Sequence, residues 1–118
     1  MSRPNVNSTS EPSNSVGTPG TGTVKVQTGD AAAKLVDLLA ALVPAVTIDP
    51  NTRWVNIDIE TNDMRWEPTG SANLTQAVGR PGYATSSIRL SAKMAKAMTV
   101  ISKTLGAPAD LHVSQVTY

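Results

Sequence analysis

The chain has 118 residues and a formal net charge of +1, and it contains no cysteine and no phenylalanine. This length allows one small domain. Without cysteine there can be no disulfide, no thiolate nucleophile and no cysteine-based zinc site. Aromatic residues make up 3% of the chain, so its core must be built from Val, Ile, Leu, Met and Ala. The small net charge argues neither for nor against a polyanionic partner.

Residues 1–28 are rich in Ser, Thr, Pro and Gly. Their only aliphatic side chains are those of Val6, Val16, Val24 and Val26, too few to offset the entropy cost of ordering the segment alone. We therefore predict an extended low-complexity arm over residues 1–28 and a folded domain over residues 29–118. An arm laid over a neighbouring subunit adds contact area and raises the effective concentration of the attached domain. This organisation favours a structural subunit.

Residues 31–43 have the leucine spacing of one short amphipathic helix. Asp30 is a suitable N-cap, and Pro44 prevents the helix from continuing. The apolar stripe would pack on a sheet or on a neighbouring subunit, and it consists of Leu35, Leu38, Leu39 and Leu42. Lys34, Asp37 and Pro44 interrupt the apolar segment 31–46, so we expect no membrane span there.

Residues 53–60 alternate between apolar and polar side chains, which predicts a β-strand. The Thr-Asn-Asp sequence at 61–63 is typical of a turn, and residues 64–66 (Met-Arg-Trp) are then the returning strand of a hairpin. In this arrangement Trp54 and Trp66 are the two large side chains that the core or an interface would bury.

The rest of the chain predicts further short strands. We expect a long loop over residues 71–82, a strand at 87–90 and a final strand at 111–118, which includes His112 and Tyr118. Residues 91–105 fit a helical stripe and also contain a β-branched run, and we favour a turn at 92–96 followed by a strand. The predicted fold is mainly β: a small antiparallel β-sandwich or barrel with one short N-terminal helix and an extended N-terminal arm.

Few residues in the chain suggest reaction chemistry. His112 is the only histidine, and a lone histidine on a strand is typical of a surface or an interface. Asp58, Glu60 and Asp63 could serve a glycosidase or bind calcium, but a solvated strand edge that discourages aggregation explains them more simply. We predict that the chain is not an enzyme and has no catalytic, metal or cofactor site.

The segment between Glu67 and Asp110 carries five cations and no acid. They are Arg80, Arg89, Lys93, Lys96 and Lys103. Such a patch could contact nucleic acid or an acidic protein. No aromatic side chains alternate with these cations to stack on bases, which argues against a nucleic-acid partner, and a solvated face is the simplest interpretation.

Several short patterns from residue 48 onward follow one another in a characteristic order. They are Arg-Trp-Val-Asn-Ile at 53–57, Asn-Asp-Met-Arg-Trp at 62–66 followed by Pro-Thr-Gly at 68–70, Val-Gly at 78–79, and the closing residues 109–118. This order resembles small all-β virion structural proteins of tailed bacteriophages. In that group an arginine–aromatic pair ends a strand before an Asp-Gly-type turn, where this chain has Glu67-Pro68-Thr69-Gly70. The resemblance implies a building role without a reaction.

From the resemblance and the arm, we expect a capsid decoration or cement protein that binds the outer shell of the virion and clamps neighbours through its arm. Its partners would be the major capsid protein or other virion proteins, and it would be a homo-oligomer. A tail or neck component is one alternative. A carbohydrate-binding adhesion module is another, which would need an exposed aromatic side chain at Trp54, Trp66 or Tyr83. The candidate interface residues are Val24, Val26, Leu35, Leu38, Leu39, Leu42, Trp54, Arg65, Trp66, His112 and Tyr118.

Overall fold

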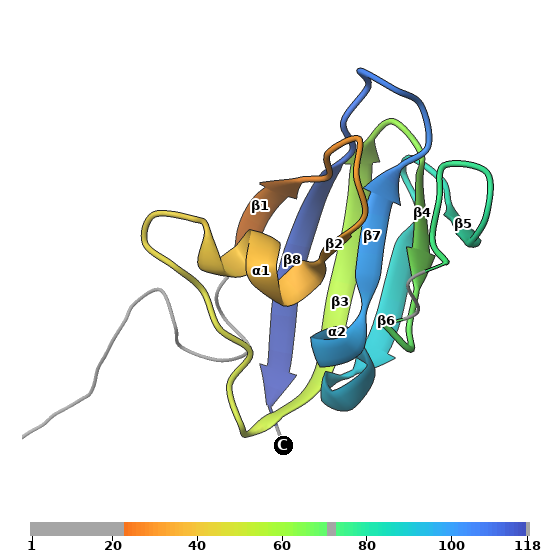
Figure 1. The fold of residues 1–118 in the computed structure, drawn as a ribbon. Helices are drawn as coiled ribbons and strands as arrows, with labels where there is room; N and C mark the ends of the chain where they lie inside the picture. The colour runs from red at the N-terminus through yellow and green to blue at the C-terminus, as the bar shows by residue number, and fades with distance from the viewer. Residues whose placement is uncertain (1–22, 71–72, 118) are drawn as a thin grey trace, which may run out of the picture.

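The computed structural model describes residues 23–70 and 73–117, whose strands form two four-stranded antiparallel sheets (Figure 1). The first sheet has the order β1 (Thr23–Gln27), β8 (Asp110–Thr117), β3 (Thr52–Thr61) and β6 (Ser87–Ser91). The second has the order β2 (Ala33–Lys34), β7 (Thr99–Ser102), β4 (Met64–Glu67) and β5 (Arg80–Gly82). The prediction of a mainly β domain is confirmed.

The hydrophobic core lies between the two sheets. Strand alternation turns Val55, Ile57 and Ile59 of β3 inward, and each is at most 1% exposed. The second sheet contributes Met64 and Trp66 to the same cluster. Aliphatic and methionine side chains therefore fill most of the core, as the composition requires.

The folded domain begins earlier than the sequence suggested. Residues 23–27 were predicted to belong to the arm, but they form β1, which pairs with β8. Thr28 is 1% exposed, and its N–H donates to the Ala109 carbonyl at 3.0 Å. Val24 and Val26 alternate with polar residues, so β1 directs its apolar side toward the core. Residues 1–22 of the predicted arm, like Tyr118, lie outside the described residues.

The first helix is shorter than predicted. Residues 31–43 were expected to be helical, but α1 spans Leu35–Ala40, because residues 33–34 first pair with β7 as β2. Asp30 is not the N-cap. Its carboxylate instead accepts hydrogen bonds from the Gly106 N–H at 3.0 Å and the Ser102 hydroxyl at 3.3 Å.

The predicted hairpin of residues 53–66 does not form. Both strands exist, but β3 belongs to the first sheet and β4 to the second, so the turn between them carries the chain across the core. Asn62 at this turn has a φ of 57°. The Asp63 carbonyl accepts from the Lys103 N–H at 3.0 Å, and the Asp63 carboxylate accepts from the Ala84 N–H at 2.8 Å. These bonds fix the crossing.

The ambiguous stretch of residues 91–105 contains both a helix and a strand. The predicted turn at 92–96 is the short helix α2 (Ala92–Ala97), and the Ser91 hydroxyl accepts from the Met94 N–H at its start. The strand predicted to follow is β7. The domain thus has two short helices where one was expected, and the predicted loop 71–82 ends in the short strand β5.

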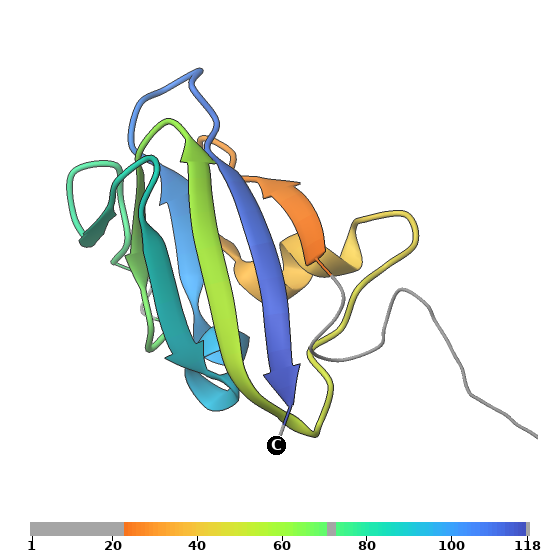
Figure 2. The same ribbon diagram turned by 180° about the vertical axis from the view of Figure 1, so that it is seen from behind.

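Both helices lie on the same side of the first sheet. In Figure 1 they stand in front of it, and Figure 2 shows from behind that no described helix covers its outer face.

Candidate interaction surface

The outer face of the first sheet is mostly polar, and no segment within residues 23–70 and 73–117 covers it; we call it the open face. Strand register brings its side chains together in rows across β1, β8, β3 and β6. The open face consists of Lys25, Trp54, Asn56, Asp58, Glu60, Ser87, Arg89, Asp110, His112, Ser114 and Val116. Alternation along each strand places these residues opposite the buried core positions.

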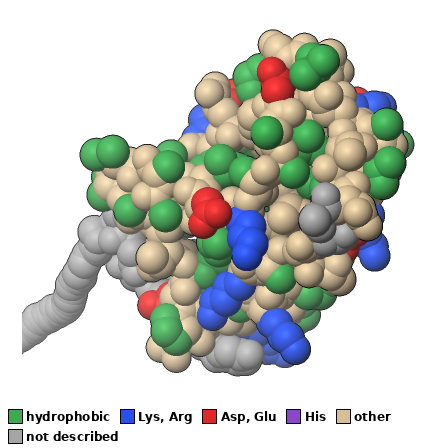
Figure 3. All heavy atoms as spheres, viewed as in Figure 1, with side chains coloured by type: hydrophobic (Ala, Val, Ile, Leu, Met, Phe, Trp, Pro, Cys, Tyr) green, Lys and Arg blue, Asp and Glu red, His purple; other side chains and the backbone are tan. Residues whose placement is uncertain are grey.

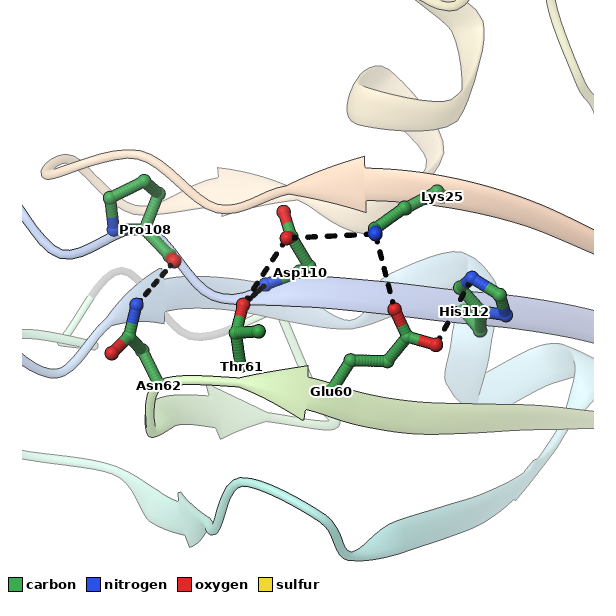
Figure 4. A network of polar contacts seen from close by, with 7 residues as sticks. All are labelled: Lys25, Glu60, Thr61, Asn62, Pro108, Asp110 and His112. Atoms are coloured by element: carbon green, nitrogen blue, oxygen red, sulfur yellow. Dashed lines mark hydrogen bonds and ion pairs between the residues drawn. The ribbon is translucent and has the colours of Figure 1, made fainter.

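A network of ion pairs crosses one end of the open face (Figure 4). The Lys25 Nζ lies 3.3 Å from Glu60 Oε1 and 3.8 Å from Asp110 Oδ2. His112 Nε2 lies 3.2 Å from the other Glu60 oxygen. The Thr61 hydroxyl donates to Asp110 at 3.2 Å. Side chains of β1, β3 and β8 are thereby joined on the solvent side of the sheet.

This network is well suited to a contact surface. The paired side chains of Lys25, Glu60 and His112 are 36–55% exposed, and such pairs typically contribute about 0–1 kcal/mol to stability. His112 therefore lies at the surface, where the sequence placed it. Its Glu60 partner was not foreseen, and the register shift between Ile59 and Thr61 brings Glu60 within reach.

The three acids considered for calcium or glycosidase chemistry have separate partners. Glu60 is bound within the network, Asp58 accepts from the Ser87 hydroxyl at 2.6 Å, and Asp63 holds the β3–β4 crossing. Within residues 23–70 and 73–117, no group of three or more His, Asp or Glu side chains is placed to hold a metal ion.

Trp54 is half-buried at the other end of the open face. The guanidinium groups of Arg53 and Arg89 lie 5.7 and 5.8 Å from its ring centre, within cation–π range. Arg89 also donates from Nε to Asn56 at 2.9 Å. Trp54 is therefore part of the open face and not one of the main core residues.

Trp66 and Arg65 are held inside the domain. Trp66 is 9% exposed, and its indole N–H donates to the Pro81 carbonyl at 3.3 Å. Arg65 donates to the Gln76 and Gly79 carbonyls at 2.9 and 3.2 Å. Both residues were candidates for an interface, but their contacts lie within the domain.

The outer face of the second sheet is partly covered, and we call it the closed face. Arg65 and Ile101 are neighbours across β4 and β7, and Arg65 binds two carbonyls of the β4–β5 loop. Ile101 and the loop residue Leu74 are only 5% and 6% exposed, although neither belongs to the central core cluster. The loop therefore lies over β4 and β7 where Arg65 and Ile101 are neighbours, and covers this part of the sheet.

A groove runs between β1 and α1, with a volume of about 580 Å³. Val26, Leu38 and Leu42 line it, with Lys25 and Asp110 at its rim. Leu35, Leu39 and Val26 are buried in the core, whereas Val24, Leu38 and Leu42 are half-buried. The predicted leucine stripe thus packs mainly inward and leaves part of its surface at the groove.

An exposed apolar tip beyond α1 was not predicted. Val43 is 98% exposed next to Pro44, and a second hollow lies between this tip and β1. Figure 3 shows hydrophobic side chains over the projecting loop, and Lys and Arg side chains on the helix-bearing face. The sequence feature that could have indicated this tip is Val43, an aliphatic residue directly between the predicted helix end and Pro44.

The aromatic side chains do not form one platform. Tyr83 is 57% exposed. It precedes β6, and the start of β6 lies beside the far end of β3, where the Ile59 N–H donates to the Ser86 carbonyl. Trp54 lies opposite Ser91, at the other end of β6. The five residue-to-residue steps from 54 to 59 span about 17 Å along the strand. Tyr83 therefore lies at the opposite end of β3 from Trp54.

Comparison with known proteins gives no relative. No family model matches the chain, and no curated protein or solved structure is significantly similar to it. Among the described residues, no helix is long and apolar enough to cross a membrane.

Proposed function

We propose that the chain is a structural subunit of a tailed-bacteriophage virion, of the capsid decoration or cement type. In this proposal it binds the outer shell, and its N-terminal segment clamps neighbouring subunits. The observation that carries the proposal is the difference between the two outer faces. The protein's own loop covers the part of the closed face around Arg65 and Ile101, whereas the open face and the adjoining β1 edge have no cover among the described residues.

The residues that resemble virion proteins also support the proposal. Residues 53–57 lie in β3, residues 62–66 form the crossing into β4, and residues 110–117 form β8. The resemblance therefore concerns strands that build both sheets.

The surfaces that the described residues of one copy offer are mostly polar, with separate exposed apolar side chains such as Val43 and Leu105. Exposed ion pairs and separate apolar side chains bind weakly, but repetition on a symmetric shell and tethering through an arm multiply weak contacts. This arrangement is suited to a protein that is present in many copies as a homo-oligomer or as repeated subunits.

A sedimentation assay tests the proposal. The full chain is mixed with purified virions that lack it, beside a variant that begins at Thr23, because residues 23–28 belong to the fold. We expect the full chain to co-sediment and the shortened variant to bind at least about tenfold more weakly, as expected for loss of a tethered second contact. A variant with residues 1–22 in scrambled order is the matched control. Equal binding by the full and shortened chains would overturn the clamp.

The same fold could serve in a tail or neck, and sedimentation with separated heads and tails distinguishes these locations. The exposure of Tyr83 favours a second candidate, a carbohydrate-binding adhesion module. In that case Tyr83→Ala would abolish binding to host-cell glycans, while virion binding would not depend on residues 1–22.

A further inference from the structure

Within the described part of the chain, β1 is an edge strand, and half of its backbone hydrogen-bonding groups have no partner there. Of the described strands it pairs only with β8, and Thr28 directly after it donates to Ala109. Bonded and non-bonded pairs alternate along an antiparallel ladder. Because 28 and 109 are a bonded pair, Val26 and Val24 are bonded to β8. The N–H and C=O groups of Lys25 and Gln27 therefore point away from β8.

The space beside this edge can receive an extended chain. The groove of about 580 Å³ between β1 and α1 borders the edge, and its lining includes Lys25 and Gln27. Both views of the ribbon place β1 between β8 and the loop that follows α1 (Figures 1 and 2). An added strand would satisfy the edge groups of β1 and place alternate side chains against Leu38 and Leu42.

We propose that residues 5–11 of a neighbouring copy add to β1 as a fifth strand of the first sheet. The argument comes from the length of chain outside the described structure. Twenty-two residues precede Thr23, and among them residues 5–11 form a stretch of seven without proline, between Pro4 and Pro12. Proline cannot donate to a strand ladder, so this stretch is long enough to pair with all five residues of β1. It includes Val6 as an apolar side chain for the groove.

The reach of the segment is long enough for docking on a neighbouring copy. Eleven residues lie between Glu11 and Thr23, and the twelve Cα-to-Cα steps from Glu11 to Thr23 span at most about 40 Å when extended. A domain of this size is about 30 Å across, so residues 5–11 can reach the β1 edge of an adjacent domain. The alternative proline-free stretch, residues 13–18, ends five residues before β1 and reaches only about 17 Å. This inference rests on the proposed clamping role of the N-terminal segment and specifies its docking site.

Residue-resolved hydrogen exchange on the purified full chain tests the proposal without virions. The amides of Val24 and Val26 are internal references, because β8 protects them at any concentration. We expect the amides of Lys25 and Gln27 to exchange about tenfold more slowly at millimolar than at micromolar protein, since pairing between copies follows mass action. If the amides of Lys25 and Gln27 are protected equally at both concentrations, the N-terminal segment of the same chain pairs with β1. If they are not protected at all, no segment pairs with the β1 edge. Either result overturns the proposal.

Two variants separate edge pairing from general destabilisation. Gln27→Pro removes an outward N–H, which an edge strand tolerates, whereas Gln27→Ala keeps it. We expect Gln27→Pro to abolish the concentration-dependent protection of the Lys25 amide, while the amides of Val24 and Val26 stay protected. Gln27→Ala should retain this protection. Val6→Asp, a change in the docking segment itself, should abolish it. If virion binding fails while this protection persists, only the proposed function is wrong.

Discussion

The two sheets of the domain share one core but treat their outer surfaces differently. On the closed face, Arg65 draws the β4–β5 loop over β4 and β7, so Ile101 and Leu74 are buried. On the open face, Lys25, Glu60 and His112 form exposed ion pairs and no described segment lies above them. The same architecture thus yields one surface that the protein's own loop partly covers and one surface that no described segment covers.

This difference shows that a small domain can bury apolar side chains outside its central core, as it does with Ile101 and Leu74 beneath the β4–β5 loop. A side chain such as Arg65 stabilises the fold because its charged guanidinium donates to two part-buried carbonyls, which would lose a hydrogen-bond donor without it. An ion pair on the open face adds little stability, so its residues can change with a partner at small cost to folding.

The largest expected contrast is between the two tryptophans. Trp66→Ala should lower the free energy of unfolding by about 3–5 kcal/mol, because it empties a core position. Trp54→Ala should cost less than about 2 kcal/mol, because the ring is half-buried between arginines. Urea unfolding measures both. Equal losses would contradict the assignment of Trp54 to the open face, and Trp66→Phe provides a folded reference if Trp66→Ala does not fold.

A matched pair of arginines sharpens the contrast. Arg65→Ala should cost about 2 kcal/mol, since two carbonyls lose a charged donor, and should speed exchange of the Val78 N–H, which donates to Thr75 within the loop. Arg89→Ala should cost less than about 1 kcal/mol, because its bond to Asn56 is exposed. A rigid β4–β5 loop in Arg65→Ala would show that another contact closes this face.

The sequence predicts those features of the fold that depend on a pattern within one segment, such as the alternation of apolar and polar residues along a strand. The period of two in β3 predicts Val55, Ile57 and Ile59 as core residues, and the same period in β8 places His112 on the outer face. The Thr-Val-Lys-Val-Gln pattern of β1 carried this signal as well, but it lies within a low-complexity composition that concealed it.

Pairing between distant segments could not be predicted from local patterns. A turn at 61–63 is typical of a hairpin, and only the competing partners β5 and β7 decide that β4 joins the other sheet. The open and closed faces depend on this choice, as does the Glu60 network, which joins strands distant in sequence. The sequence therefore predicts which single residues, such as His112, lie at the surface. It does not predict which of them lie side by side, because this depends on the pairing of distant strands.

The ion-pair network of the open face should have a small and salt-dependent effect. Glu60→Gln removes the charge shared by Lys25 and His112, and we expect a loss below about 1 kcal/mol that disappears at about 1 M salt. Thermal unfolding at low and high salt measures it. A larger loss that salt does not reduce would indicate that the network is structural.

The smallest expected effect concerns Glu67, at the end of β4. Hydrogen bonds from the Thr69 hydroxyl and backbone N–H hold the pKa of Glu67 below its usual value. A lowered folded-state pKa gives stability that is present above the unfolded pKa and is lost as the pH falls through the folded pKa. We expect Thr69→Val to raise the pKa of Glu67, measured by NMR titration; an unchanged pKa would assign the shift to the remaining contacts.

A density map of the assembled virion tests the central claim, that the uncovered surface serves attachment. The account predicts many copies at symmetric positions, with the open face or the β1 edge in contact with a neighbouring chain and the closed face directed away from it. Isolated single copies whose open face and β1 edge both face solvent would contradict it.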